Sequence, residues 1–102
     1  MIEKEYVSKN HSKFLLKYHI IFVCKYRRKI LIGNIATCVK NILIDIANKS
    51  DFRIEVVETD KDHVHLLVNS DPKVSPLQIV CRLKQESTKR LWMLYPETLL
   101  KW

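Results

Sequence analysis

Two segments of alternating side chains around a short polar turn constrain the fold of this chain most strongly. In the first segment Phe52, Ile54 and Val56 alternate with charged residues, and the second is the run His63 to Val68. Such segments are typical of half-buried strands, and the turn at 60–62 (Asp-Lys-Asp) is short enough to join them as an antiparallel hairpin. We therefore expect a β-hairpin with one face in the core.

The chain before the hairpin predicts a strand followed by a helix. Residues 14–25 are rich in Tyr, Phe, Ile and Val, which favours a strand. Asn34 can cap the start of a helix that ends near residues 48–50. The apolar side chains of this helix recur at helical spacing and are Ile35, Val39, Ile42, Leu43 and Ile46.

A second helix is predicted after the hairpin. Asp71-Pro72 ends the strand, and Ser75-Pro76 begins the helix, because serine caps a helix and proline fits its first position. Pro96 ends it, and a break near Ser87-Thr88 could divide it into two short helices. The stripe that we expect to be buried consists of Leu77, Val80, Leu83, Leu91 and Trp92.

The predicted order is β-α-β-β-α, which gives an α+β fold. It corresponds to the ferredoxin-like βαββαβ unit, an antiparallel sheet covered by helices, without its last strand. Residues 97–102 are too few for a turn and a strand, so we expect the fourth strand to be absent or very short. The 102 residues are 47% apolar with one glycine, which excludes a disordered chain. We expect one domain over 1–102, with 1–12 flexible or extended.

The charge of the chain indicates its class of partner. With 18 basic and 11 acidic residues the formal net charge is +7, which attracts polyanions, of which nucleic acid is the commonest. The longest apolar run, Ile20 to Cys24, is far shorter than a membrane helix, and the N-terminus is not a secretory signal, so we expect no membrane partner. Cys24, Cys38 and Cys81 are odd in number and form no CxxC motif, which favours reduced core residues in a cytoplasmic protein.

The feature that carries chemistry is His63-Val64-His65. Residues two apart on a strand point the same way, so both imidazoles leave one face while Val64 enters the core. Two such histidines can bind one divalent metal, with Asp60 and Asp62 in reach as a further ligand or as partners that hold the rings. The alternative from spacing alone is two exposed strand histidines that flank a core valine.

Two basic clusters are candidates for DNA contact. The first has four cations around one aromatic ring, which suits phosphate contacts and base stacking, or else serves as a solvated strand end. It consists of Lys25, Tyr26, Arg27, Arg28 and Lys29. The second cluster lies on the polar face of the second helix, where such charges also serve solubility. It consists of Lys84, Lys89 and Arg90.

Three motifs together resemble those of the small IS200/IS605-type transposases. Residues 18–28 (YHIIFVCKYRR) are similar to the first-strand motif of that family, and residues 62–68 (DHVHLLV) resemble its HUH motif, His-hydrophobic-His. The segment from Ser75 to Tyr95-Pro96 is similar to the part that follows. The resemblance runs from about Leu15 to Trp102 and keeps the order and spacing of the three motifs.

The resemblance implies a homodimeric transposase of a mobile element, with a ferredoxin-like core that acts on single-stranded DNA and hairpins. His63 and His65 would hold Mg²⁺ or Mn²⁺, which polarises the scissile phosphate. A tyrosine would attack the phosphorus and become joined to the 5′ phosphate. The basic strand end and the second helix would follow the DNA.

The chain departs from this pattern at the nucleophile. In the family the tyrosine lies on a helix after the fourth strand, and that helix also supplies a further metal ligand. Tyr6, Tyr18, Tyr26 and Tyr95 do not match its position, and Tyr95 is the nearest substitute by sequence order. We therefore expect a truncated copy that retains DNA and metal binding. The alternative is a non-enzymatic nucleic-acid-binding module with an incidental or structural histidine site.

Overall fold

A computed structural model describes residues 16–24 and 27–97, so the expectation for residues 1–12 lies outside the described residues. The elements appear in the predicted order β-α-β-β-α. Their bounds are Leu16–Val23 for β1, Gly33–Asn48 for α2, Phe52–Asp60 for β2, His63–Ser70 for β3 and Pro76–Leu94 for α3.

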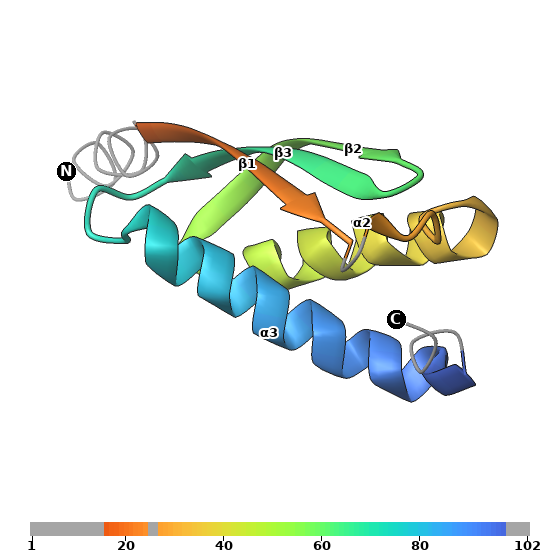
Figure 1. Ribbon diagram of the computed structural model, residues 1–102. Coiled ribbons are helices and arrows are strands. Elements are labelled where there is room, and N and C mark those ends of the chain that lie inside the picture. The colour runs from red at the N-terminus through yellow and green to blue at the C-terminus, as the bar shows by residue number, and fades with distance from the viewer. Residues whose placement is uncertain (1–15, 25–26, 98–102) are drawn as a thin grey trace, which may run out of the picture.

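The three strands form one antiparallel sheet in the order β1-β3-β2. β3 is therefore the central strand, and β1 and β2 run parallel to each other on its two sides. Figure 1 shows both helices on the same face of this sheet, and no element of the described residues covers the other face. This arrangement confirms the predicted α+β class and the βαββα part of the ferredoxin-like unit.

The core lies between the sheet and the two helices. On β3 the buried side chains alternate with half-buried ones, as predicted for Val64, Leu66 and Val68. Helix α2 contributes its own apolar stripe to the same cluster, including Leu43 and Ile46. We call the helix-covered side of the sheet the inner face and the uncovered side the open face.

The alternation predicted for β2 is wrong in its second half because the strand contains a β-bulge. Ile54 pairs with Val68 and Val56 pairs with Leu67, so Glu55 is an extra residue in the ladder. One extra residue reverses which side chains face inward. Val56 is therefore exposed, whereas Val57 packs against the core. The bulge also turns Asp60 to the open face.

Helix α2 begins differently from the prediction. The position before the helix is Ile32, whose side chain makes no capping hydrogen bond, so the expected cap at Asn34 is wrong. Gly33 has a φ of 56°, a left-handed conformation that glycine adopts without a steric penalty. The turn into the helix is thus made by the backbone of the single glycine, and Asn34 lies within the first turn.

Helix α3 begins as predicted and is continuous. The Ser75 side chain accepts a hydrogen bond from the backbone N–H of Gln78, and the Gln78 side chain accepts one from the N–H of Ser75. This capping box fixes the start. The helix continues to Leu94, so the expected break near residues 87–88 is wrong.

The predicted buried stripe of α3 is partly wrong. Its buried residues are Ile79, Leu83 and Leu91, whereas Leu77 is 71% exposed and Trp92 is 42% exposed. The correct stripe follows the four-residue spacing from Ile79, on which neither of those two residues falls.

All three cysteines are free thiols, but they do not share one environment. Cys24 is buried, Cys38 is half-buried and Cys81 is exposed, so the expectation that all three are core residues is wrong for Cys81. Burial raises the pKa of the Cys24 thiol, and the nearby charge of Asp62 adds to the effect. No helix among the described residues is long and apolar enough to cross a membrane.

An ion pair joins the two helices. Arg90 of α3 donates a hydrogen bond of 2.7 Å from Nη1 to Oδ2 of Asp45 on α2, and Lys49 lies 3.2 Å from the same oxygen. The hydrogen bond from Arg90, followed by that from Lys49, holds the pKa of Asp45 below its usual range. The folded state therefore favours the ionised carboxylate.

This lowered pKa predicts a pH-dependent effect of Asp45→Asn. Stability from an aspartate whose pKa is lowered on folding is present above the unfolded-state pKa and is lost as the pH falls through the folded-state pKa. The variant should be less stable than the wild type at pH 7, and the difference should shrink below about pH 4. Urea unfolding midpoints between pH 7 and pH 2.5 measure it. Arg90→Met should show the same trend, and a difference that stays constant with pH would contradict the prediction.

Candidate metal and nucleic-acid site

The two histidines of the HxH motif lie side by side on the open face of β3. Both are half-buried, and the intervening Val64 is buried on the inner face. The ring centroids of His63 and His65 are 4.8 Å apart, with the ring planes at 69°. Strand alternation thus places the two imidazoles together, as the spacing predicts.

A third imidazole, which the sequence analysis did not assign to the site, lies beside this pair. His19 of β1 is opposite Leu67 in the ladder, and its ring centroid is 5.7 Å from that of His65. A shallow depression on the open face is lined by His19, His65 and Glu58, among others. Spacing within β1 puts His19 on one of its faces, but only the register between β1 and β3 puts it next to His65.

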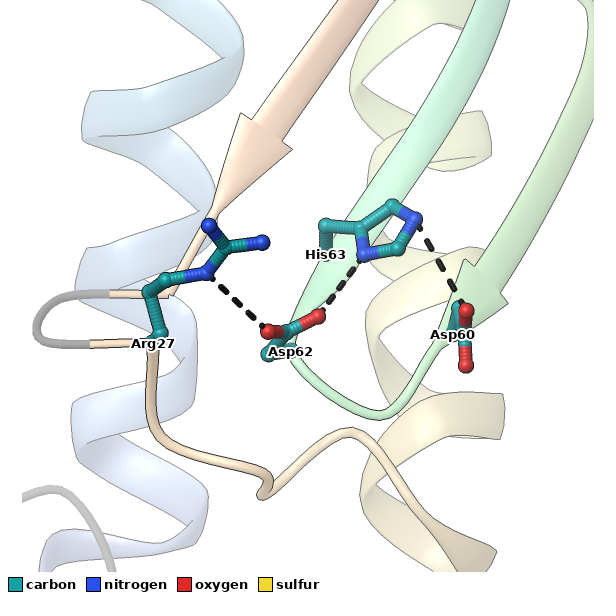
Figure 2. A network of polar contacts seen from close by, with 4 residues as sticks. All are labelled: Arg27, Asp60, Asp62 and His63. Atoms are coloured by element: carbon teal, nitrogen blue, oxygen red, sulfur yellow. Dashed lines mark hydrogen bonds and ion pairs between the residues drawn. The ribbon is translucent and has the colours of Figure 1, made fainter.

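Two aspartates flank His63, as Figure 2 shows. Nδ1 of His63 lies 2.8 Å from Oδ1 of Asp62, and Nε2 lies 3.9 Å from Oδ2 of Asp60. The hydrogen bond with His63 is the largest of the causes that hold the pKa of Asp62 below its usual range, and Arg27 adds to it. An ionised carboxylate only accepts hydrogen bonds, so Nδ1 is the nitrogen that donates.

The consequence for His63 is a defined orientation of its ring. In the neutral imidazole only one nitrogen carries the proton, so donation from Nδ1 leaves Nε2 with a free lone pair. A histidine that binds a metal through one nitrogen while the other donates to a carboxylate is a common arrangement in metal sites. Asp62 acts as that carboxylate for His63, and Asp60 lies on the side of the ring where Nε2 points.

The donor set fits a divalent metal that accepts nitrogen ligands and keeps open positions for oxygen. Imidazole suits transition metals, while carboxylate and water suit Mg²⁺ and Mn²⁺. No group of three or more His, Cys, Asp or Glu side chains within residues 16–24 and 27–97 is arranged to hold a metal ion by itself. The described residues thus supply two imidazoles and a nearby carboxylate, which leaves positions of a metal open for further ligands.

The first basic cluster is only partly described, since Lys25 and Tyr26 lie outside the described residues. Arg27, Arg28 and Lys29 are all exposed. The loop that carries them lies against the β2–β3 turn, where Nε of Arg27 is 3.4 Å from Oδ2 of Asp62 (Figure 2). The structure therefore brings the described residues of this cluster to the end of the sheet where His63 lies.

The second basic cluster is not brought to the histidines. Helix α3 covers the inner face, so Lys84 and Lys89, both exposed, lie on the other side of the sheet from His63. Lys84 lies at the rim of an apolar groove between β1 and α3.

Arg90, the third residue of this cluster, is bonded to Asp45. It therefore has a structural partner, and its role in DNA contact stays a prediction. Arg82 is a further exposed cation on α3.

The two described tyrosines do not lie at the histidine pair. Tyr18 is opposite Val68 in the ladder and packs against the core on the inner face. Tyr95 follows the end of α3 and also packs against the core. Tyr6 and Tyr26 lie outside the described residues. Neither Tyr18 nor Tyr95 shares the open face with the imidazoles.

Comparisons with known proteins give a consistent result. A family model described as "Transposase IS200 like" matches residues 12–102. The chain is 37% identical over 84 residues to the ISDra2 transposase TnpA of Deinococcus radiodurans. It is 34% identical over 82 residues to the transposase for insertion sequence element IS200 of Salmonella typhimurium.

A solved structure agrees with these sequence matches. The fold matches a crystal structure of a Deinococcus radiodurans protein described as a transposase, with a TM-score of 0.77 and 34% identity. The matches cover 82%, 80% and 79% of this chain, but only 60%, 54% and 62% of the respective relatives. The chain therefore spans little more than half the length of the proteins that it matches.

Proposed function

Since this chain belongs to the IS200-like transposase family, we propose that it binds single-stranded or hairpin DNA together with a divalent metal, Mg²⁺ or Mn²⁺. It would serve as the DNA-binding and metal-binding core of a transposase. The observation that carries the proposal is the pair His63 and His65, which lies on the open face beside an exposed cationic loop.

The exposed loop supplies the attraction for the DNA backbone. Arg28 and Lys29 are exposed at the end of the sheet where His63 lies, on a chain with a formal net charge of +7. Cations that neutralise phosphates release condensed counterions, which gives affinity without sequence preference. A strand bound there would place its phosphates next to the histidine pair.

The residues of the open face would hold the metal at this position. His63 would bind through Nε2, because its Nδ1 is engaged by Asp62, and His65 would bind beside it. Asp60 would add a carboxylate oxygen or hold a bound water. When bound, the metal supplies Lewis-acid polarisation of a phosphate oxygen.

Strand cleavage in this proposal needs a nucleophile that the described residues do not place at the site. In the complete family reaction a tyrosine would become joined to the 5′ phosphate of the DNA. Tyr18 and Tyr95 are packed against the core instead of facing the histidines. We therefore assign DNA and metal binding to the described residues. A homodimer is also part of the proposal, since the outer edge of β1 has no neighbouring strand among the described residues.

Removal of the two exposed cations tests DNA binding. Arg28→Ala with Lys29→Ala should weaken binding to a fluorescein-labelled hairpin with a single-stranded extension. It should also reduce the slope of log affinity against log salt by about 1.4, because each lost phosphate contact on a single strand removes about 0.7. Fluorescence anisotropy from 50 to 300 mM NaCl measures both. In the same samples, with Mn²⁺ added, a denaturing gel should show no DNA joined to protein.

The matched control removes the same charge elsewhere. Lys49 and Lys73 lie near the opposite end of the sheet, next to the paired residues Phe52 and Ser70. Their double alanine variant should keep the salt slope of the wild type. Equal slopes in both double variants would remove the loop from the interface, and protein-linked DNA would show that a tyrosine of this chain reaches the scissile phosphate.

A further inference from the structure

Arg27 has a backbone conformation that is unusual for an arginine. Its φ is 55°, and it is the one non-glycine residue with a positive φ among residues 16–24 and 27–97. Side chains with a Cβ resist this left-handed region because the Cβ atom crowds the following carbonyl oxygen. Such a residue persists where the surrounding structure fixes it, and these positions cluster at functional sites.

Backbone hydrogen bonds fix the loop that contains Arg27. The Arg27 N–H donates to the Cys24 carbonyl at 2.7 Å. The Cys24 N–H donates to the Asp62 carbonyl at 2.7 Å, and the Leu31 N–H donates to the Lys61 carbonyl at 2.9 Å. The loop is thus joined at both ends to the β2–β3 turn, which directly precedes His63.

The Asp62 side chain connects Arg27 to His63. One carboxylate oxygen, Oδ2, lies 3.4 Å from Nε of Arg27, and the other, Oδ1, lies 2.8 Å from Nδ1 of His63 (Figure 2). The Asp62 side chain is 17% exposed, whereas that of Arg27 is 76% exposed. The arginine therefore has one donor towards the carboxylate, while the rest of its guanidinium faces solvent.

We propose that Arg27 is a positioning residue for His63 and acts through Asp62, in addition to any contact that it makes with DNA. The inference rests on the metal site of the proposed function. Arg27 holds the Asp62 carboxylate in an orientation in which Oδ1 accepts the Nδ1 proton of His63. The lone pair of Nε2 is then kept on the side of Asp60, where a metal would bind.

The geometry of the guanidinium gives Arg27 two partners at once. It carries five N–H donors in a planar fork, and a phosphate takes two parallel hydrogen bonds from such a fork. With Nε directed to Asp62, the two Nη groups are available to a DNA phosphate. Lysine has no planar fork and cannot reproduce this pairing. Arg27 would therefore join the bound DNA backbone to the ring that holds the metal.

The first measurement needs no metal. Long-range ¹H–¹⁵N spectra of the metal-free protein report which ring nitrogen of His63 carries the proton. The wild type should show protonation at Nδ1, and Arg27→Gln should shift the population towards Nε2. Asp62→Asn removes the anionic acceptor and should shift it further. Arg27→Gly, which suits a φ of 55°, removes the side chain without the backbone penalty and should resemble Arg27→Gln.

The second measurement is Mn²⁺ affinity by calorimetry. Arg27→Gln and Arg27→Gly should lose about tenfold, the lower end of the effect of replacing residues that orient metal ligands. Arg28→Gln is the matched control, because Arg28 is also exposed on the loop, whereas the side-chain partners of Asp62 among the described residues are Arg27 and His63. It should weaken DNA binding and leave both the tautomer of His63 and Mn²⁺ affinity unchanged.

The outcomes separate this inference from the proposed function. If Arg27→Gln weakens DNA binding but keeps the His63 tautomer and Mn²⁺ affinity of the wild type, Arg27 is a phosphate contact only and the inference is wrong. If the wild type binds no Mn²⁺, the metal site fails, and the tautomer measurement still decides whether Arg27 orients His63. A tautomer shift in Arg27→Gly as well as Arg27→Gln supports the role of the side chain.

Discussion

The double variant His63→Ala, His65→Ala is expected to lose Mn²⁺ binding by a hundredfold or more. The reason is that His63 and His65 are the two imidazoles that lie together beside the aspartates, and their removal leaves carboxylates and the imidazole of His19, which belongs to the neighbouring strand. Altering a residue that only orients a metal ligand costs about 10–100-fold, so removing both ligands should cost at least as much. Calorimetry or Mn²⁺ electron paramagnetic resonance measures the loss.

The third imidazole provides the control for this experiment. His19 is on the same face, with its ring centroid 5.7 Å from that of His65, but no aspartate among the described residues is bonded to its ring as Asp62 is to that of His63. His19→Ala should therefore retain Mn²⁺ binding within a few-fold of the wild type. Mn²⁺ affinity that is unchanged in the double variant would refute the metal site. An equally large loss of affinity in His19→Ala would show that the bound metal lies closer to β1.

The second large effect is expected from shortening one buried side chain of the core next to this site. Leu66→Ala should reduce the free energy of unfolding by about 2–5 kcal/mol, the range for removing a buried leucine side chain. Leu66 is 1% exposed on the inner face of the central strand, where it packs among the buried residues of both helices. Urea unfolding followed by circular dichroism measures the change.

The adjacent leucine provides a matched control, because the same side-chain atoms are removed. Leu67 points to the open face, where it is half-buried and lines the depression next to His19 and His65. Leu67→Ala should cost clearly less than Leu66→Ala, because less apolar surface is returned to water and little cavity remains. Equal losses in the two variants would contradict the assignment of the two faces of β3.

Much of the fold could be predicted from local patterns. The hairpin, the two helices and the inner face of β3 follow from alternation, helical spacing and the Ser75 cap, each of which depends on nearby residues. The errors have a common cause. The continuity of α3 and the exposure of Trp92 depend on how the helix lies on the sheet, and sequence spacing alone does not determine this.

The candidate site was predictable where it depended on one strand. The pairing of His63 with His65 follows from the alternation of side chains along one strand. The position of His19 beside them could not be predicted in this way, because it depends on the register of β1 against β3. The contact of Arg27 with Asp62 needed more: a left-handed φ and a loop bonded to the β2–β3 turn. These features link positions that are 35 residues apart, so no local pattern indicates them.

The bulge at Glu55 has a consequence for how the site can be lost. Lys17 and Asn69 contact the Glu55 carboxylate at 3.4 and 3.5 Å, but the feature itself is one additional residue in the ladder. Because Ile54 and Val56 already pair with consecutive residues of β3, deleting Glu55 would restore strict alternation and leave Asp60 opposite His63. Deleting one residue between the bulge and Asp60 would instead turn Asp60 to the inner face, with every side chain of the site still in the sequence. A scan of point substitutions would overlook this, because the relevant variable is the number of residues between the bulge and the turn and not their identity.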